Sequence, residues 1–138
     1  MAEQSTQERE GSVEERLPLT PAVFHILLAL AEGERHGYAI MREVAEQTGG
    51  QMRLGPGTLY GSIRRMLDDG VIEESEARPD PTVDDERRRY YRLTSFGRRL
   101  AEAEAARLQA LTRTAQARGL LPQASGPLGQ PAGAGGLR

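Results

Sequence analysis

Hydrophobic residues recur at helical spacing in several stretches of the chain, most clearly in residues 54–71. There an apolar stripe repeats at i, i+4, i+7 and i+8, as on one face of an α-helix. Its members are Leu59, Ile63, Met66 and Leu67. Pro56 suits the first turn of a helix, and Gly70 suits a left-handed stop after the last turn. The pattern therefore predicts a short amphipathic helix over about 57–69.

The opposite face of this helix carries small residues in its first half and two arginines in its second half. Its members are Gly57, Thr58, Gly61, Arg64, Arg65 and Asp68. Small residues followed by arginines allow close approach to the backbone and groove of a nucleic acid. A solvated amphipathic helix explains the same pattern, so the helix alone leaves both interpretations open.

Three further helices are expected from apolar periodicity and from residues typical of helix ends. The first begins at Thr20-Pro21 and runs to about Glu32, with apolar residues around most of its circumference. We expect it to pack on two sides, one of which is a second subunit. Residues 36–49 predict a second helix, whose inward stripe is Tyr38, Met41, Val44 and Ala45.

Alternating polar and apolar residues predict a β-hairpin after residue 70. Its strands are expected at 71–77 and 88–93, with Tyr91 and Leu93 on one side of the second strand. The polar segment between them is too long for a tight turn and predicts a flexible tip. Two short helices followed by such a hairpin indicate a winged helix-turn-helix, an α+β fold that is mainly α with a small β-hairpin wing.

The last predicted helix begins after Thr94 and continues to about Arg118, further than a domain of this size needs. A homodimer would bury its surplus apolar face together with that of the first helix. The residues expected in this interface are Phe24, Leu28, Leu100, Leu108 and Leu111. The predicted organisation is a disordered arm (1–16), a winged domain (17–93), a dimerisation helix (94–118) and a disordered Gly/Pro-rich tail (119–138).

Composition excludes several classes of function. The 138 residues contain no cysteine, which excludes disulfides and thiolate metal sites, and the two histidines, His25 and His36, are not spaced as a metal pair. No P-loop and no plausible nucleophile–histidine arrangement is present, so we expect neither an enzyme nor a cofactor. No apolar run is long enough to span a bilayer, and we expect a cytoplasmic protein that is associated with the nucleoid when bound.

Charge is unevenly distributed along a chain whose net charge is −2. Residues 1–16 hold five glutamates and two arginines, whereas residues 87–100 hold six arginines and no acid. One interpretation places Arg87, Arg88 and Arg89 against phosphates. The alternative is that the acidic residues 84–86 neutralise them within the hairpin.

Three motifs occur in order with suitable spacing. They are His36-Gly37-Tyr38, Gly57-Thr58-Leu59-Tyr60, and Arg89-Tyr90-Tyr91-Arg92-Leu93-Thr94. With the order of elements, these motifs resemble the PadR family of bacterial transcriptional regulators over about residues 17–118. The single C-terminal helix is similar to the compact subfamily.

The resemblance implies a homodimer that binds a palindromic operator in double-stranded DNA, usually as a repressor, and is released by a small molecule or another signal. It makes 57–69 the recognition helix. The residues that it places at DNA are Thr58, Tyr60, Gly61, Arg64 and Arg65 of the helix and Arg87, Arg88 and Arg89 of the hairpin. Gly61 stands where many relatives carry proline, which leaves the first turn less rigid.

Two questions stay open at this point. The winged domain could instead be a protein-interaction module whose arginines face an acidic partner. The identity of any small-molecule effector is unknown. Its binding site is expected in the dimer interface near Phe24, Leu28 and Leu108. The alternative is that this interface is fully packed and holds no ligand.

Overall fold

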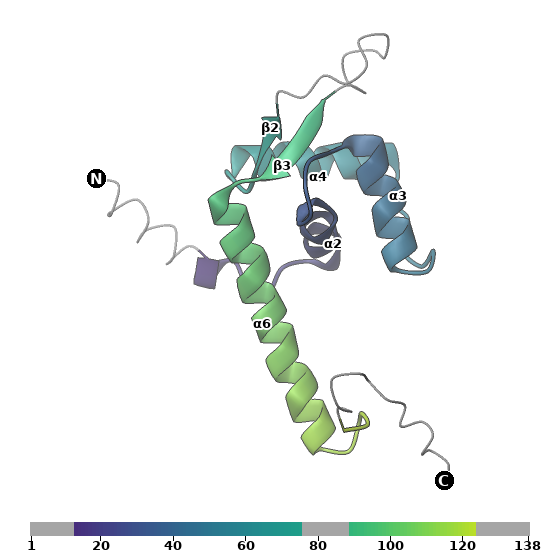
Figure 1. Ribbon diagram of the computed structural model, residues 1–138, viewed down its shortest axis with the longest axis vertical. Coiled ribbons are helices and arrows are strands. Elements are labelled where there is room, and N and C mark those ends of the chain that lie inside the picture. The colour runs from purple at the N-terminus through teal and green to yellow at the C-terminus, as the bar shows by residue number, and fades with distance from the viewer. Residues whose placement is uncertain (1–12, 76–88, 124–138) are drawn as a thin grey trace, which may run out of the picture. The chain divides into compact units, whose positions relative to one another are not determined.

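The described residues, 13–75 and 89–123, form helices and a small antiparallel sheet in the computed structural model (Figure 1). In chain order the elements are α2 (Pro21–Leu30), β1 (Arg35–His36), α3 (Gly37–Gln47), α4 (Pro56–Asp68), β2 (Ile72–Ser75), β3 (Tyr90–Leu93) and α6 (Ser95–Ala117). The chain divides into two compact units, residues 1–104 and 105–138, each of which is described by itself. The expected mainly α fold with a small hairpin is confirmed.

Helix α2 begins as its sequence predicts. The Thr20 hydroxyl accepts a hydrogen bond from the Val23 N–H at 3.3 Å, and proline occupies the first turn. Two arginines satisfy carbonyl groups at its other end: Arg35 Nε donates to Ala29 O at 2.7 Å, and Arg98 Nη2 donates to Ala31 O at 2.9 Å. These cations also complement the negative end of the helix dipole.

The core of the first unit is formed by the apolar faces of α2, α3 and α4, the sheet and the first turns of α6. Its fully buried side chains include Ile26, Leu27, Leu30, Ile40, Val44, Leu59, Ile63, Ile72 and Leu100. Helix α2 packs against α3 and β3, and α4 packs against α3 and β2 (Figure 1). The stripe predicted for α4 is largely confirmed, since Leu59, Ile63 and Met66 are buried and Leu67 is partly buried.

Residues 13–16 are ordered, which corrects the expectation of disorder through residue 16. Residues 13–15 form a helical turn, and Val13 is a member of the core. Arg16 makes an ion pair with Asp69 at 3.3 Å and lies over the ring of Phe96 at 5.6 Å from its centroid. The charged composition of residues 1–16 gave no sign of these contacts. Residues 1–12 lie outside the described part of the chain.

The sheet has the strand order β1-β3-β2, and both pairings are antiparallel. The predicted hairpin is confirmed, with Ile72 opposite Leu93 and Ser75 opposite Tyr90. Strand β1 was not predicted, because a two-residue strand has no period to detect. The hairpin tip, with Arg87 and Arg88, lies outside the described residues, and so does most of the expected C-terminal tail.

Helix α6 is fixed at its start by contacts with the segment before β2. Thr94 Oγ1 donates to Gly70 O at 2.6 Å and accepts from Gly97 N at 3.0 Å. A Cβ at Gly97 would overlap Val71 O, so this close packing requires glycine. The helix ends before Gly119, which has a φ of +79°. Across residues 13–75 and 89–123, no helix has the length and apolarity that crossing a membrane would require.

Candidate nucleic-acid interface

Helix α4 presents a solvent-facing strip opposite its buried stripe. At 100° per residue, the centre of this strip contains Gly57, Gly61, Arg64 and Asp68, with Thr58 and Arg65 along one edge. Gly55 caps the helix without a side-chain hydrogen bond, and residues 55–58 are exposed. The first turn therefore offers backbone N–H groups and a positive dipole end to an anion.

The glycines of this strip are not required by packing. A Cβ added at Gly57 would meet nothing within 4 Å, and one added at Gly61 would meet only Arg65 Nη1 at 3.9 Å. Because glycine has no side chain, these two positions leave the backbone of α4 uncovered, so that a binding partner can approach it closely.

The two arginines of α4 differ in their surroundings. Arg64 is exposed and makes no hydrogen bond or ion pair with another described residue. Arg65 is also exposed, but its Nη2 donates to Ser62 Oγ at 3.4 Å, which is a long and weak hydrogen bond. Both guanidinium groups are accessible to an anion, and Arg64 gives up no described interaction to reach one.

Tyr60 holds two helices together, a role that its motif alone did not reveal. Its ring is partly buried and lies against the backbone of Gly37, at the start of α3. A side chain at position 37 would occupy the same space. The pairing of the two motifs His36-Gly37-Tyr38 and Gly57-Thr58-Leu59-Tyr60 is the only sequence signal for this contact.

Tyr38 does not point inward as its stripe predicted. It is 58% exposed, because α3 begins at Gly37 and buries Gly37 and Ile40 together with Val44, the one residue of the predicted stripe that is fully buried. The guanidinium of Arg42, also exposed, lies 5.9 Å from the centre of the Tyr38 ring. The first turns of α3 therefore add a phenolic hydroxyl and a cation to the groups that are able to contact phosphate.

Histidine 36 caps α3 and joins it to the sheet. Its Nδ1 accepts a hydrogen bond from Ala39 N at 3.1 Å, and its ring meets that of Tyr90 edge to face at 5.3 Å. The Nδ1 of His25, the other histidine, lies within hydrogen-bond distance of Gln47 Oε1, at 2.7 Å. The described residues contain no cluster of side chains suited to holding a metal ion.

Two arginines, Arg92 in β3 and Arg89 directly before it, face glutamates of β2. Arg92 Nε lies 2.8 Å from Glu73 Oε2, and Arg89 Nη1 lies 3.6 Å from Glu74 Oε2. All four side chains are about half exposed, so the pairs are weak and exchangeable. Residues 84–86, the partners expected from the sequence, lie outside the described residues. The glutamates of β2 were not expected as partners, because their approach depends on how the two strands pair.

The apolar residues expected in a dimer interface have different surroundings. Leu28 on the first unit and Leu108 and Leu111 on the second are exposed, and Phe24 is partly buried. Leu100 is 1% exposed within one chain. Its assignment to a dimer interface is therefore corrected, since it has almost no surface left for a partner.

Comparison with known proteins places these features in a family. The model described as "Transcriptional regulator PadR-like family" matches residues 26–103. The chain is 42% identical over 80 residues to an uncharacterized 37.1 kDa protein in transposon TN4556 of Streptomyces fradiae, which covers 58% of this chain and 21% of that protein. It is 36% identical over 89 residues to the transcriptional regulator Rv3488 of Mycobacterium tuberculosis, covering 64% and 77% respectively.

The fold is also found among solved structures. A PadR family transcription regulator from Clostridium difficile R20291 matches with a TM-score of 0.59 at 22% identity, over 70% of this chain and 96% of that one. At this identity the similarity shows the fold, a winged helix with a long C-terminal helix. The chain spans only about a fifth of the length of the Streptomyces relative.

Proposed function

Because the chain belongs to the PadR-like family of transcriptional regulators, we propose that it binds an inverted-repeat operator as a homodimer, with α4 as the recognition helix. The family is one of regulators and not of enzymes, in agreement with the expectation from composition. We propose repression as the outcome, because a dimer seated on an operator excludes other proteins from the same DNA.

The observation that carries this proposal is the open strip of α4. Gly57 and Gly61 leave the helix backbone uncovered, the first turn offers N–H groups, and Arg64 is exposed on the same face about two turns further on. In a helix-turn-helix, the N-terminal half of the second helix contacts base edges in the major groove while other groups hold phosphates. Thr58, Arg64 and Arg65 are the proposed DNA contacts of the helix.

We further propose supporting phosphate contacts from outside α4. Arg89 belongs to this group and would exchange Glu74 for a phosphate, and Arg87 and Arg88 remain proposed contacts from the hairpin. Tyr38 and Arg42 of α3 join them because both are exposed at the helix that packs against α4. Tyr60 is proposed to act mainly by positioning α4, with only its outer edge available to DNA.

Selection of genomic fragments by the purified protein tests the function directly. The expected result is a short inverted repeat whose half-sites are roughly one helical turn, about 10 base pairs, apart. If the domain is instead a protein-interaction module, no reproducible DNA motif will be recovered.

Arginine variants then test the proposed face. Arg64→Ala is expected to weaken operator binding by roughly 5- to 150-fold and to lower the salt slope by about one, because it removes one charged DNA contact. Arg113→Ala, which makes the same charge change in the second unit, is the matched control. An Arg64→Ala/Arg65→Ala double variant that binds and responds to salt like the unmodified protein contradicts the assignment of this face.

A further inference from the structure

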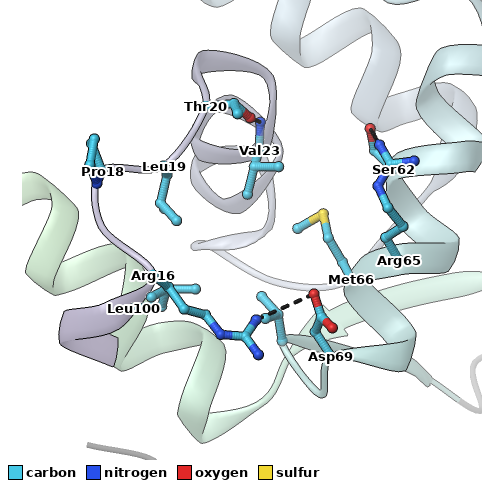
Figure 2. Close-up of a pocket in the computed structure, with 11 residues that line it drawn as sticks. Arg16, Pro18, Leu19, Thr20, Val23, Ser62, Arg65, Met66, Asp69 and Leu100 are labelled. Atoms are coloured by element: carbon cyan, nitrogen blue, oxygen red, sulfur yellow. Dashed lines mark hydrogen bonds and ion pairs between the residues drawn. The ribbon is translucent and has the colours of Figure 1, made fainter. Parts of the chain in front are cut away.

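A pocket of about 360 Å³ opens between residues 16–23, the second half of α4 and the start of α6 (Figure 2). Its lining residues are Arg16, Pro18, Leu19, Thr20, Val23, Ser62, Arg65, Met66, Asp69, Val71 and Leu100. All of them belong to the first unit. The volume is within the range of about 300–1,000 Å³ that is typical of small-molecule sites.

The lining of this pocket combines aliphatic and polar side chains. Leucine, valine and methionine side chains supply the apolar part, and the described lining contains no aromatic ring. The charged lining residues are two arginines and one aspartate, an excess of one positive charge. Arg16 is paired with Asp69 in Figure 2, so Arg65 carries the positive charge that has no carboxylate partner in the lining.

A buried hydroxyl lies beside this unbalanced cation. Ser62 is 3% exposed and lines the pocket, and its Oγ accepts only the 3.4 Å hydrogen bond from Arg65 among the interactions described for it. A serine hydroxyl that accepts from a guanidinium still has its own proton to donate. Arg65 and Ser62 together thus present charged and neutral donors to one small anionic group.

We propose that this pocket binds a small aliphatic monocarboxylate. Its carboxylate accepts hydrogen bonds from Arg65 and Ser62, while its hydrocarbon chain lies against Leu19, Val23, Met66 and Leu100. One negative charge matches the net charge of the lining, and the absence of an aromatic wall among the described lining residues favours an alkyl chain over a ring that would stack.

If the chain binds DNA as proposed above, a carboxylate bound in this pocket regulates that binding. Arg65 belongs both to the pocket and to the proposed DNA face, so a bound carboxylate and a DNA phosphate compete for the same guanidinium. Ser62 and Met66 place further ligand contacts on α4. By linkage, the carboxylate weakens DNA binding by the same factor as DNA weakens carboxylate binding.

Isothermal titration of the full chain with octanoate, in the absence of DNA, tests the pocket independently of the proposed function. We expect one octanoate per chain and much weaker binding of octan-1-ol and benzoate. Arg65→Gln is expected to weaken octanoate binding about tenfold or more, because it removes the charged hydrogen-bond donor. Val23→Phe is expected to abolish binding by filling the aliphatic part.

Arg64→Gln is the matched control, since it makes the same charge change one residue away without lining the pocket. It is expected to bind octanoate like the unmodified protein. No saturable octanoate binding, equal binding of octan-1-ol or benzoate, or unchanged binding in Arg65→Gln or Val23→Phe overturns the proposal. An unmodified protein that binds octanoate but selects no operator from genomic fragments points instead to failure of the proposed function.

Discussion

The ring of Tyr60 occupies the space beside the Gly37 backbone, where an added Cβ would lie only 2.7 Å from Cζ and 2.9 Å from Cε1 of the ring. This contact joins the start of α3 to the first half of α4. We expect Gly37→Ala to lower the free energy of unfolding by about 1–3 kcal/mol, because either the ring or a helix must shift. Urea unfolding followed by circular dichroism measures the change.

A matched glycine on α4 separates this steric effect from ordinary glycine replacement. Gly57→Ala adds the same methyl group where nothing lies within 4 Å, so it is expected to be neutral or to stabilise the fold by up to about 1 kcal/mol. Adding Tyr60→Leu to Gly37→Ala should recover part of the lost stability. Equal stability of the Gly37→Ala and Gly57→Ala proteins would refute the explanation.

The Thr94 hydroxyl connects the segment before β2 to the start of α6. It donates to Gly70 O at 2.6 Å and caps the helix through Gly97 N. Thr94→Val keeps the shape but removes both interactions, so we expect a loss of about 1–2 kcal/mol and a fall in Tm of roughly 4–8 °C per kcal/mol. Thr94→Ser keeps the hydroxyl and should lose much less; calorimetry distinguishes the two variants.

The sequence was sufficient to predict those elements whose signal is periodic or tied to a helix end. The α4 stripe repeats over two turns between Pro56 and Gly70, and its burial agrees with that period. The predicted inward face of α3 was wrong at Tyr38, because four apolar residues on a short helix are compatible with more than one rotation of the helix about its axis. Only packing against its neighbours selects the face with Ile40 and Val44.

Parts of the candidate site could not be predicted because they depend on contacts between distant residues. The pairing of Arg89 with Glu74 needs the register of two strands, and strand β1 is too short to show a pattern. The pocket beside Arg65 is lined by residues from 16 to 100. No local pattern places Arg16 opposite Asp69, because that approach follows from how the helices pack.

The Arg89–Glu74 pair limits how much positive charge the hairpin offers to DNA. Glu74→Gln is expected to tighten DNA binding several-fold at low salt and to steepen the salt slope by up to about one, since Arg89 is freed for phosphate. Folding stability should change by less than about 1 kcal/mol, because the pair is exposed. Fluorescence anisotropy at several salt concentrations measures both quantities.

Glu102→Gln provides the control for that experiment, because it removes the same charge from an exposed position on α6. It changes the net charge equally without touching the hairpin. If both variants tighten DNA binding to the same extent, the effect comes from overall charge and the proposed contact by Arg89 is wrong.

Substitution of Leu111 tests the proposed homodimer most directly. Leu111 is 55% exposed within one chain, and a leucine at that exposure gains stabilisation when a second copy covers it. Leu111→Glu is expected to shift the dimer towards monomers, because a buried carboxylate without a partner is costly. Gln109→Glu adds the same charge at an exposed position elsewhere on the helix circumference and should leave the dimer intact. Sedimentation velocity over a range of protein concentrations distinguishes the two variants, and equal behaviour of both would remove Leu111 from the proposed interface.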